Sequence, residues 1–249
     1  MSHIEIKNLG HRFPNGHWGI NEINLSVEQG SFVIIAGKNG SGKTTFCRHL
    51  NGLLSPTTGS ITIDGLHVEK YPEKARRKVG MVFQNANAQI VGETVYSDVA
   101  FGPENLGLKR AAINQRVEES LELTGLTGKE LQSPHTLSGG EKRKLAIAGV
   151  LAMNPDILIF DEPFSNLDYP GSILILKQIL DLHESGHTIF IVTHELEKTV
   201  ACASQIVLFE NGSIVKTGSP LEILEIVEQY GVRLPCSAKL GQGIQSWLN

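Results

Sequence analysis

A glycine-rich segment of the chain carries the residue types that bind phosphate groups. Residues 37–44 read Gly-Lys-Asn-Gly-Ser-Gly-Lys-Thr and match the pattern G-x-x-x-x-G-K-[ST]. The segment lies between an apolar run at residues 32–36 and a predicted helix, which is the context that a phosphate-binding loop requires. In such a loop, backbone N–H groups converge on phosphate oxygens, the Lys43 ammonium lies against the β and γ phosphates, and the Thr44 hydroxyl is available to Mg²⁺. The spacing and the flanking elements disfavour the alternative, a glycine-rich turn that carries a lysine by chance.

Two carboxylates follow another apolar run. Residues 157–160 read Ile-Leu-Ile-Phe and precede Asp161 and Glu162, and open α/β sheets bind ligands at the carboxyl ends of their strands. Successive strand residues point to opposite sides, so the two carboxylates cannot share one role. We expect Asp161 to support Mg²⁺ through its water shell and Glu162 to orient the attacking water. In isolation the pair could simply end a strand, but the phosphate loop upstream disfavours that interpretation.

A second anion site is predicted at residues 138–141, Ser-Gly-Gly-Glu. Ser138 and Glu141 match the S-x-x-E capping box, which alone indicates only an ordinary helix start. Two glycines in a first turn are costly for a helix, however, and they expose N–H groups at its positive end. One nucleotide cannot use this site and the phosphate loop together unless the two sites face each other. The pattern therefore indicates a dimer.

The elements that must position these residues change in character along the chain. The first third is rich in predicted strands, because apolar residues alternate with polar ones around residues 4–9 and 23–27, on either side of a turn at residues 14–16. In the second half, strands alternate with helices, and this βαβ repetition predicts a parallel sheet. Apolar strands are expected at residues 32–36, 79–83, 157–160 and 188–192, and helices at residues 72–78, 139–153 and 172–183.

Two further regions complete the expected organisation. Residues 92–131 have apolar positions near a 3.6-residue spacing and are predicted to form a mostly helical insertion. Near the end, a hairpin about Asn211-Gly212 is followed by a helix that runs through Tyr230.

The composition is that of a folded globular chain. The 249 residues are 41% hydrophobic and 19% charged, which excludes disorder. Three cysteines without a CxxC pair, Cys47, Cys202 and Cys236, indicate neither a disulfide framework nor a zinc site. We expect no signal peptide and no membrane-spanning helix, so any membrane attachment would come through protein partners. A net charge of -4 disfavours a dedicated nucleic-acid binder.

Taken in order, these motifs resemble those of the nucleotide-binding subunit of an ABC transporter. The resemblance covers nearly the whole chain and rests on five segments, namely residues 37–44, 137–141, 157–162, 165–168 and 192–194. It implies an α/β fold, a P-loop NTPase of the ABC ATPase type with an N-terminal antiparallel β subdomain, a parallel-sheet core and a helical subdomain. It also implies a head-to-tail dimer that closes on two ATP molecules. Each ATP lies between the phosphate loop of one subunit and residues 138–140 of the other.

The resemblance further divides the chain and assigns its residues. One ABC ATPase domain spans residues 1–249, with the β subdomain and core at 1–91 and 154–217, the helical subdomain at 92–153 and a C-terminal extension at 218–249. The implied catalytic residues are Lys43, Gln84 of the glutamine loop, Glu162 and His194 of the switch. The implied Mg²⁺ residues are Thr44, Gln84 and Asp161. The implied ATP-binding residues are Phe13, Gly37, Lys38, Asn39, Gly40, Ser41, Gly42, Lys43, Thr44, Thr45, Gln84, Ser138, Gly139, Gly140, Glu141, Asp168 and His194. Phe13 is the candidate for stacking on adenine, and Trp18 competes for that role.

A narrower resemblance is to the ATPase subunits of energy-coupling factor importers, which take up cobalt, nickel or vitamins. Residues 84–85, 98–108 and 146–153 carry it. It implies a transmembrane coupling protein whose short helices dock on the surface after Gln84, a membrane-embedded substrate-binding protein, and a place at the cytoplasmic face of the membrane. The chain departs from the pattern at Lys38, where an uncharged residue is common, and at residues 85–88, which lack proline and acidic residues. Neither departure removes a catalytic group.

Other functions remain open at this point. A soluble ABC-type ATPase that acts on nucleic acid, or in another non-transport process, is disfavoured by the acidic charge and by the lack of a coiled-coil insertion, zinc modules or a second ATPase half. A non-catalytic nucleotide-binding module is disfavoured because Glu162 and His194 are both present. His183 and His187 could suggest a metal site, but Gly186 lies between them at a predicted helix end, so we expect a solvated helix terminus. The cargo, and the choice between a homodimer and a pair with a paralogue, stay open.

Overall fold

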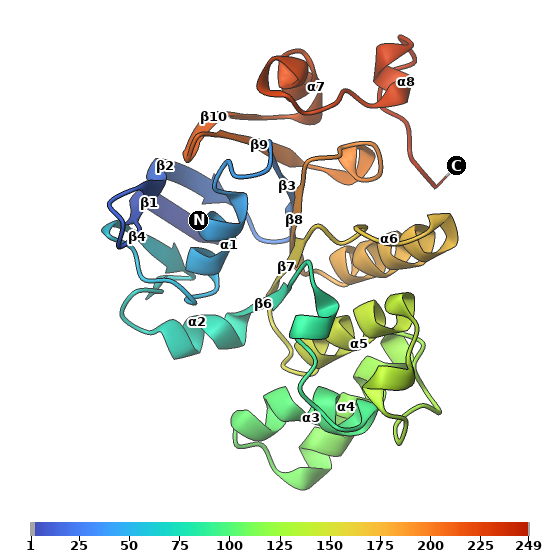
Figure 1. The fold of residues 1–249 in the computed structure, drawn as a ribbon. Helices are drawn as coiled ribbons and strands as arrows, with labels where there is room; N and C mark the ends of the chain where they lie inside the picture. Colours follow the sequence, from blue (N-terminus) through green and yellow to red (C-terminus); the bar gives the residue numbers. More distant parts are fainter. Residues whose placement is uncertain (1–2, 249) are drawn as a thin grey trace.

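The computed structural model describes residues 3–248, which form two sheets flanked by helices (Figure 1). An antiparallel sheet has the strand order β2-β1-β4-β5 and comprises β1 (Ile4–Arg12), β2 (Trp18–Val27), β4 (Thr58–Ile63) and β5 (Leu66–His67). A six-stranded sheet has the order β10-β9-β3-β8-β7-β6 and comprises β3 (Phe32–Ala36), β6 (Val79–Val82), β7 (Ile157–Asp161), β8 (Thr188–Thr193), β9 (Gln205–Glu210) and β10 (Ser213–Gly218). The five neighbouring strands β9, β3, β8, β7 and β6 are parallel, and β10 is antiparallel to β9. The predicted parallel sheet is confirmed.

The helices surround these sheets. They are α1 (Lys43–Leu50), α2 (Pro72–Lys78), α3 (Val95–Asn105), α4 (Arg110–Leu123), α5 (Gly139–Leu151), α6 (Tyr169–Glu184), α7 (Pro220–Leu224) and α8 (Cys236–Lys239), with short 3-10 helices η1 (Ala86–Ala88), η2 (Pro134–Thr136), η3 (Val200–Cys202) and η4 (Val227–Tyr230). The single helix expected to run through Tyr230 is in fact α7 followed by η4, because the backbone at Ile226 leaves helical geometry at a φ of −120°. Three β-branched residues in this stretch, Ile223, Ile226 and Val227, lower its helix propensity.

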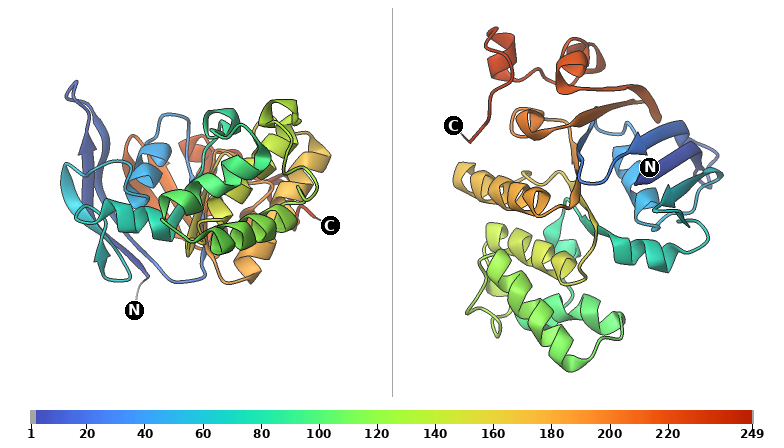
Figure 2. Two further views of the ribbon diagram at one scale, coloured as in Figure 1. Left: turned by 90° about the horizontal axis from the view of Figure 1, so that it is seen from below. Right: turned by 180° about the vertical axis from the view of Figure 1, so that it is seen from behind.

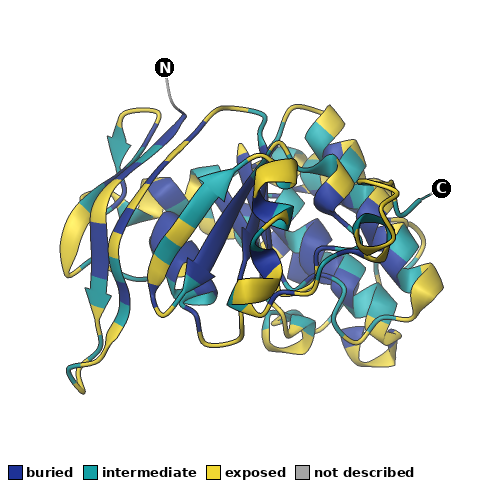
Figure 3. Ribbon diagram, turned by 90° about the horizontal axis from the view of Figure 1, so that it is seen from above, coloured by how far each residue is buried: buried dark blue, intermediate teal, exposed yellow. Residues whose placement is uncertain are grey.

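Burial along the strands follows from what covers each sheet (Figure 3). All five residues of β3 and of β7 are buried, because both faces of the six-stranded sheet are covered. One face packs with α1 and the antiparallel sheet around a core that includes Phe46, Phe190 and Phe209. The other face packs against α5 and α6 around Phe160 and Phe32. The continuous apolar runs in the sequence therefore mark the central strands.

The region α3–α5 has a hydrophobic core of its own and lies on the far side of the sheet from β1 and β2 (Figure 2). Thr94 begins α3 with a capping box to Ser97. Helix α5 belongs to two cores at once, since Leu145 and Ala148 face α3 and α4, whereas Ala146, Ile147 and Val150 face the sheet. Helix α5 is therefore the element that joins the helical region to the sheet.

Candidate active site

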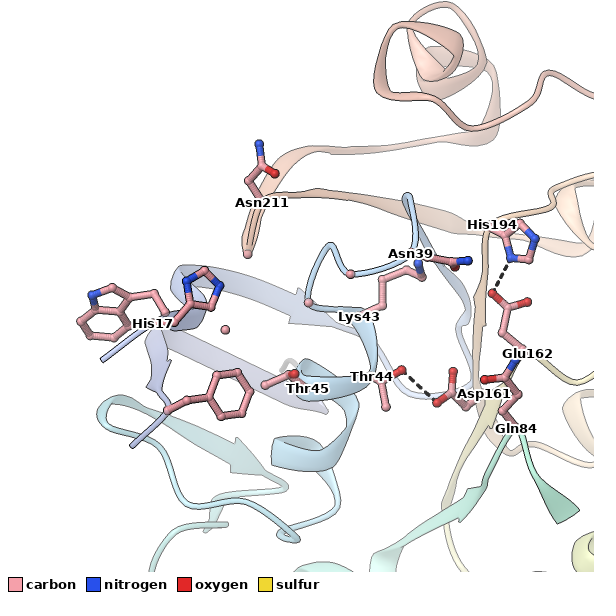
Figure 4. Close-up of a pocket in the computed structure, with 16 residues that line it drawn as sticks. His17, Asn39, Lys43, Thr44, Thr45, Gln84, Asp161, Glu162, His194 and Asn211 are labelled. Carbon is pink, nitrogen blue, oxygen red and sulfur yellow. Dashed lines mark hydrogen bonds and ion pairs between the residues drawn. The ribbon is translucent and has the colours of Figure 1, made fainter. Parts of the chain in front are cut away.

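The carboxyl ends of β3, β7 and β8 meet at a cavity of about 500 Å³ (Figure 4). The parallel register pairs Ala36 with Thr193 and Asp161 with Val192, so the segments after these strands open on one edge of the sheet. The cavity brings together most of the residues expected from the sequence, namely Phe13, Asn39, Gly40, Gly42, Lys43, Thr44, Thr45, Gln84, Asp161, Glu162 and His194. Trp18, the competitor of Phe13, lines it as well.

The backbone of the phosphate loop adopts a conformation that requires glycine. Gly42 has a φ of 104°, and a Cβ there would lie 2.8 Å from the carbonyl oxygen of Gly19. The Lys43 Nζ donates to the carbonyl oxygens of Gly37 at 2.6 Å and Lys38 at 2.8 Å, so the loop itself holds the ammonium in place. Burial lowers the pKa of Lys43, an effect that the nearby carboxylates of Glu162 and Asp161 oppose.

A group of oxygen atoms lies beside the start of α1. The Thr44 hydroxyl donates to Asp161 Oδ2 at 3.0 Å, and the Gln84 amide lines the cavity next to them (Figure 4). Burial raises the pKa of Asp161, while the hydrogen bond from Thr44 and the charge of Lys43 act against that rise. Hydroxyl, amide and carboxylate oxygens are the donors that Mg²⁺ prefers, so these residues fit that ion.

Glu162 and His194 form a hydrogen-bonded pair at the same end of the cavity as Asp161 and Gln84 (Figure 4). His194 Nδ1 and Glu162 Oε1 are 2.7 Å apart, and the Thr193 hydroxyl donates to Glu162 Oε2 at 3.3 Å. Glu162 has a φ of 48°, which ends β7 after Asp161 and turns the side chain away from that of Asp161. The two carboxylates therefore have separate partners, although the turn at Glu162 separates them rather than the expected alternation of strand residues. This geometry can hold and orient a water next to a terminal phosphate.

Some expected residues lie outside the cavity. Ser138 and Glu141 form the predicted capping box of α5, and the Glu141 carboxylate also pairs with Lys129, which lowers its pKa to about 2. Asp168 caps α6 by accepting the N–H of Gly171 at 2.9 Å. The other expected residues that do not line the cavity are Gly37, Lys38, Ser41, Gly139 and Gly140. The structure thus separates the 138–141 segment from the phosphate loop within one chain.

Several lining residues were not expected. His17, Gly19, Asn211 and Gly212 reach the cavity from the two hairpins, and Thr193 contacts Glu162. The sequence did indicate a turn at Asn211-Gly212, where Asn211 has a φ of 48°. The turn meets the phosphate loop through a hydrogen bond from the Gly212 N–H to the Ser41 carbonyl at 2.9 Å, and no local pattern indicates that contact.

The histidine pair at the end of α6 does not form a metal site. The helix ends at Glu184, so His187 lies beyond it, as expected. His183 is not a solvated terminus, because its Nε2 is 2.8 Å from the Gly30 carbonyl oxygen and its ring packs edge-on against Phe32. Within residues 3–248, no group of three or more His, Cys, Asp or Glu side chains could hold a metal ion. Over the same residues, no helix is both long enough and apolar enough to cross a membrane.

The fold and this cavity together define the class of protein. A family model described as "ABC transporter" matches residues 20–165, more than half of the chain, and the chain therefore belongs to the ABC transporter family. It is an ATPase of that family, which binds ATP and couples its hydrolysis to transport.

Named relatives make the comparison more specific. The Energy-coupling factor transporter ATP-binding protein EcfA of Methanothermobacter thermautotrophicus is 42% identical over 243 residues, which cover 95% of this chain and 78% of that protein. The structure of cbiO1 from Clostridium perfringens, described as part of the ABC transporter complex cbiONQ, matches with a TM-score of 0.82 and 32% identity, over 97% of this chain and 99% of that one. A dimeric ATP-binding cassette in a post-hydrolysis state with bound ADP and Pi matches with a TM-score of 0.78 and 28% identity, over 87% of this chain and 98% of that one. The expected ABC ATPase fold is confirmed.

Proposed function

We propose that this chain energises an energy-coupling factor type importer of a metal ion or a vitamin from the cytoplasmic face of the membrane, by closing as an ATP-bound dimer. The observation that carries the proposal is the single cavity in which the phosphate loop, Asp161 and the Glu162–His194 pair meet. The similarity to EcfA over 95% of the chain supports the assignment to this kind of importer.

Hydrolysis follows from the residues around the cavity. The phosphate loop binds the β and γ phosphates, and Lys43 neutralises part of their charge. Bound Mg²⁺, held by Thr44 and Gln84 with Asp161 acting through a water ligand, would supply further charge neutralisation. Glu162 orients and polarises the attacking water, while His194 fixes the Glu162 carboxylate and reaches the γ phosphate.

A partner subunit completes the site. The segment 138–140 is exposed or half-exposed at the N-terminus of α5 and does not line the cavity of its own chain. N–H groups at a helix start bind anions, so this segment is suited to the γ phosphate of an ATP held by another subunit. Asp168 then lies in the loop that crosses between the two subunits. A head-to-tail dimer, with a second copy or with a paralogous ATPase, brings both halves together.

A groove between the sheet and the helical region is suited to the membrane partner. It has a volume of about 260 Å³ and its wall is mostly apolar, with Met81, Phe83 and Val150 among the lining residues. Three large apolar side chains at this groove are unusually exposed, namely Leu53 at 46%, Val91 at 62% and Phe101 at 52%. Exposed apolar patches of this kind mark protein interaction sites. We assign the groove to a short helix of a transmembrane coupling protein, which in turn contacts a membrane-embedded substrate-binding protein.

The same groove separates two parts of one domain. We take residues 1–249 as one ABC ATPase domain in which residues 92–153 form the helical subdomain, 1–91 together with 154–217 form the rest, and 218–249 form an extension for contacts between subunits. A partner helix in this groove would contact both the helical subdomain and the rest of the domain. It would therefore shift whenever one of them moves relative to the other. No nucleic acid has a role in this scheme.

The decisive test is a substitution that keeps binding and removes hydrolysis. Glu162→Gln keeps the shape of the side chain but removes the base, so turnover is expected to fall by about 10² to 10⁴-fold. Phosphate release and molar mass by light scattering are measured with MgATP and with MgADP. The variant is expected to form a stable dimer with MgATP only. Glu195→Gln, which changes an exposed carboxylate outside the cavity, serves as the matched control and is expected to behave like wild type.

Wild-type turnover in Glu162→Gln would reject the role of Glu162, and a variant that fails to dimerise, alone or with the second ATPase of its complex, would reject dimer closure. Affinity purification of the tagged chain from gently solubilised membranes of its own organism tests the importer assignment. A multispanning coupling protein and a small membrane-embedded binder are expected to co-purify. Recovery of soluble partners or nucleic acid alone would favour a non-transport ATPase.

A further inference from the structure

Arg143 is a buried cation that the mechanism above does not use. It lies on α5 with 4% of its surface exposed. Its Nη1 donates to the Phe83 carbonyl at 2.8 Å, and its Nη2 donates to the Gln84 carbonyl at 2.9 Å. Nη2 also reaches the Ser165 hydroxyl at 3.3 Å and the Glu162 carbonyl at 3.5 Å. One guanidinium therefore joins the two segments that follow β6 and β7, residues 83–84 and 162–165.

The charge of Arg143 is not offset by an ion pair. Within residues 3–248, its guanidinium donates hydrogen bonds only to carbonyl and hydroxyl oxygens, and the carboxylate of Asp161 acts on it only at longer range. Burial lowers the pKa of Arg143, and the charge of Asp161 opposes that shift. A buried cation without a bonded counter-ion is costly to keep, and a neutral side chain of similar size would pack at lower cost.

The backbone that Arg143 contacts is unusual at Glu162. A non-glycine residue with a φ of 48° is strained and persists only where its surroundings hold it. The Glu162 carbonyl accepts the Ser165 N–H at 3.1 Å and the Ser165 hydroxyl at 2.9 Å, in addition to Arg143. Arg143 thus helps to hold Glu162 in its geometry and, through the Gln84 carbonyl, also holds the main chain at Gln84.

The position of Arg143 on α5 also connects it to the N-terminus of that helix. The helix begins at Gly139 with Ser138 as its cap, and Arg143 follows within two turns, at a rise of roughly 1.5 Å per residue. Helix α5 is packed on both sides, so its N-terminus and Arg143 move together. The N-terminus is the part assigned to the ATP of the partner subunit, and Arg143 contacts the residues that serve the ATP of its own subunit.

We propose that Arg143 is a positioning residue that couples the two ATP sites of the dimer, by linking the start of α5 to the main chain of Gln84 and Glu162. This inference rests on the proposed function, because it requires the head-to-tail dimer. ATP bound to one subunit draws in the 138–140 segment of the second subunit, and α5 of that second subunit shifts. The Arg143 guanidinium on this helix then sets the geometry of Gln84 and Glu162 in the second subunit. Each ATP thereby influences hydrolysis at the opposite site, which is the origin of cooperativity between them.

The test compares Arg143→Met, Arg143→Lys and Arg116→Met with wild type. Arg116 is the matched control, since it is another arginine of the helical region that donates to main-chain carbonyls, those of Ala152 at 3.2 Å and Met153 at 3.3 Å, away from the cavity. Turnover is measured against ATP concentration, and binding of a fluorescent ADP analogue is measured separately. In Arg143→Met, kcat is expected to fall by about 10 to 100-fold and the Hill coefficient to fall to about 1. ADP affinity is expected to be unchanged, because Arg143 does not contact the phosphate loop.

Arg143→Lys keeps the charge but not the planar fork, so it is expected to restore part of the turnover and little of the cooperativity. If Arg143→Met does not fold, the Hill coefficient of Arg143→Lys decides the question. A wild-type Hill coefficient in a folded variant at position 143 would overturn the coupling, even if kcat falls. A wild-type protein that neither dimerises with ATP nor hydrolyses it cooperatively would instead reject the proposed function, and that failure would be visible before any variant at 143 is made.

Discussion

At the scale of single residues, two aromatic side chains that could stack on adenine, Phe13 and Trp18, line the cavity. Phe13 packs against Gly19 so closely that a Cβ on that glycine would lie 2.5 Å from the Phe13 ring. His11 packs edge-on against the same ring at a centroid distance of 4.8 Å. Trp18 is 38% exposed and lacks this enclosure. A ring that is already held in place loses less freedom on binding, which favours Phe13 as the adenine-stacking residue.

Removal of the Phe13 ring should therefore weaken nucleotide binding. Base stacking on an aromatic side chain contributes about 1 to 3 kcal/mol, so Phe13→Ala is expected to raise the Kd for ATP by about 5 to 100-fold. The measurement is a fluorescence titration with a labelled nucleotide, and Trp18→Ala provides the comparison with a small expected change. A larger loss in Trp18→Ala than in Phe13→Ala would reverse the assignment.

The residues of the site could be predicted in part. Lys43, Thr44, Asp161 and Glu162 were predictable because their spacing along the chain sets their chemistry, and all four line the cavity. Arg143 was not predictable, because its proposed role depends on carbonyl groups of two distant segments, and no pattern in the sequence around Arg143 indicates those contacts.

At the scale of elements, the junction of α5 with the edge strand β6 depends on a missing side chain. A Cβ on Gly80 would lie 2.3 Å from Val150 Cγ1 and 3.0 Å from Pro155 Cγ. Helix α5 can approach the sheet this closely only because position 80 is glycine. The close packing of the helical region on the sheet therefore depends on Gly80 of β6.

Gly80→Ala is expected to destabilise the protein by about 1 to 3 kcal/mol through overpacking. Thermal unfolding measures the change, and Gly80→Ala with Val150→Ala should recover part of it. Gly149→Ala is the matched control, because its nearest neighbour is 3.9 Å away and alanine favours the helix, so it should be neutral or stabilising. An unchanged Tm in Gly80→Ala would show that the helix can shift without cost.

The types of the elements followed from periodicity more readily than their arrangement. The buried runs at residues 32–36 and 157–160 predicted central strands, and both are buried throughout. The order of the sheet was not predictable, since β3 lies between β8 and β9, and those strands come much later in the chain. The order of the strands depends on how the faces of the sheet pack against the helices, and no local sequence pattern indicates it.

At the scale of the whole molecule, His49 joins α1 to the antiparallel sheet, because its ring lies beside that of His11 in β1. It is fully buried, and within the described residues neither ring nitrogen has a hydrogen-bond partner. Burial, together with a smaller effect of the neighbouring His11, whose ring is 4.8 Å away, lowers the pKa of His49 to about 4. The folded protein therefore holds this ring neutral.

The stability of the fold should depend on pH through His49. The unfolded ring titrates near pH 6.5, so its contribution is complete above that pH and is lost progressively as the pH falls toward 4, by about 2 to 3 kcal/mol in all. Urea unfolding between pH 8 and pH 4.5 measures the loss. His49→Leu should show a shallower decline over this range, because the other titrating groups are common to both proteins. Parallel curves for the two proteins would show that His49 is not the group responsible.

The position of β3 also has a consequence for how the chain is made. Its two neighbours, β8 and β9, are the last parallel strands to be synthesised. On a ribosome, a chain that has reached residue 187 contains the complete phosphate-loop sequence but has nothing to pair with residues 32–36, five apolar residues in a row. At roughly 5 to 20 residues per second, this strand stays unpaired for several seconds to half a minute. ATP cannot stabilise the nascent chain at this stage, because the phosphate loop has not yet formed. We therefore expect a chaperone that binds short apolar segments to protect the chain during synthesis.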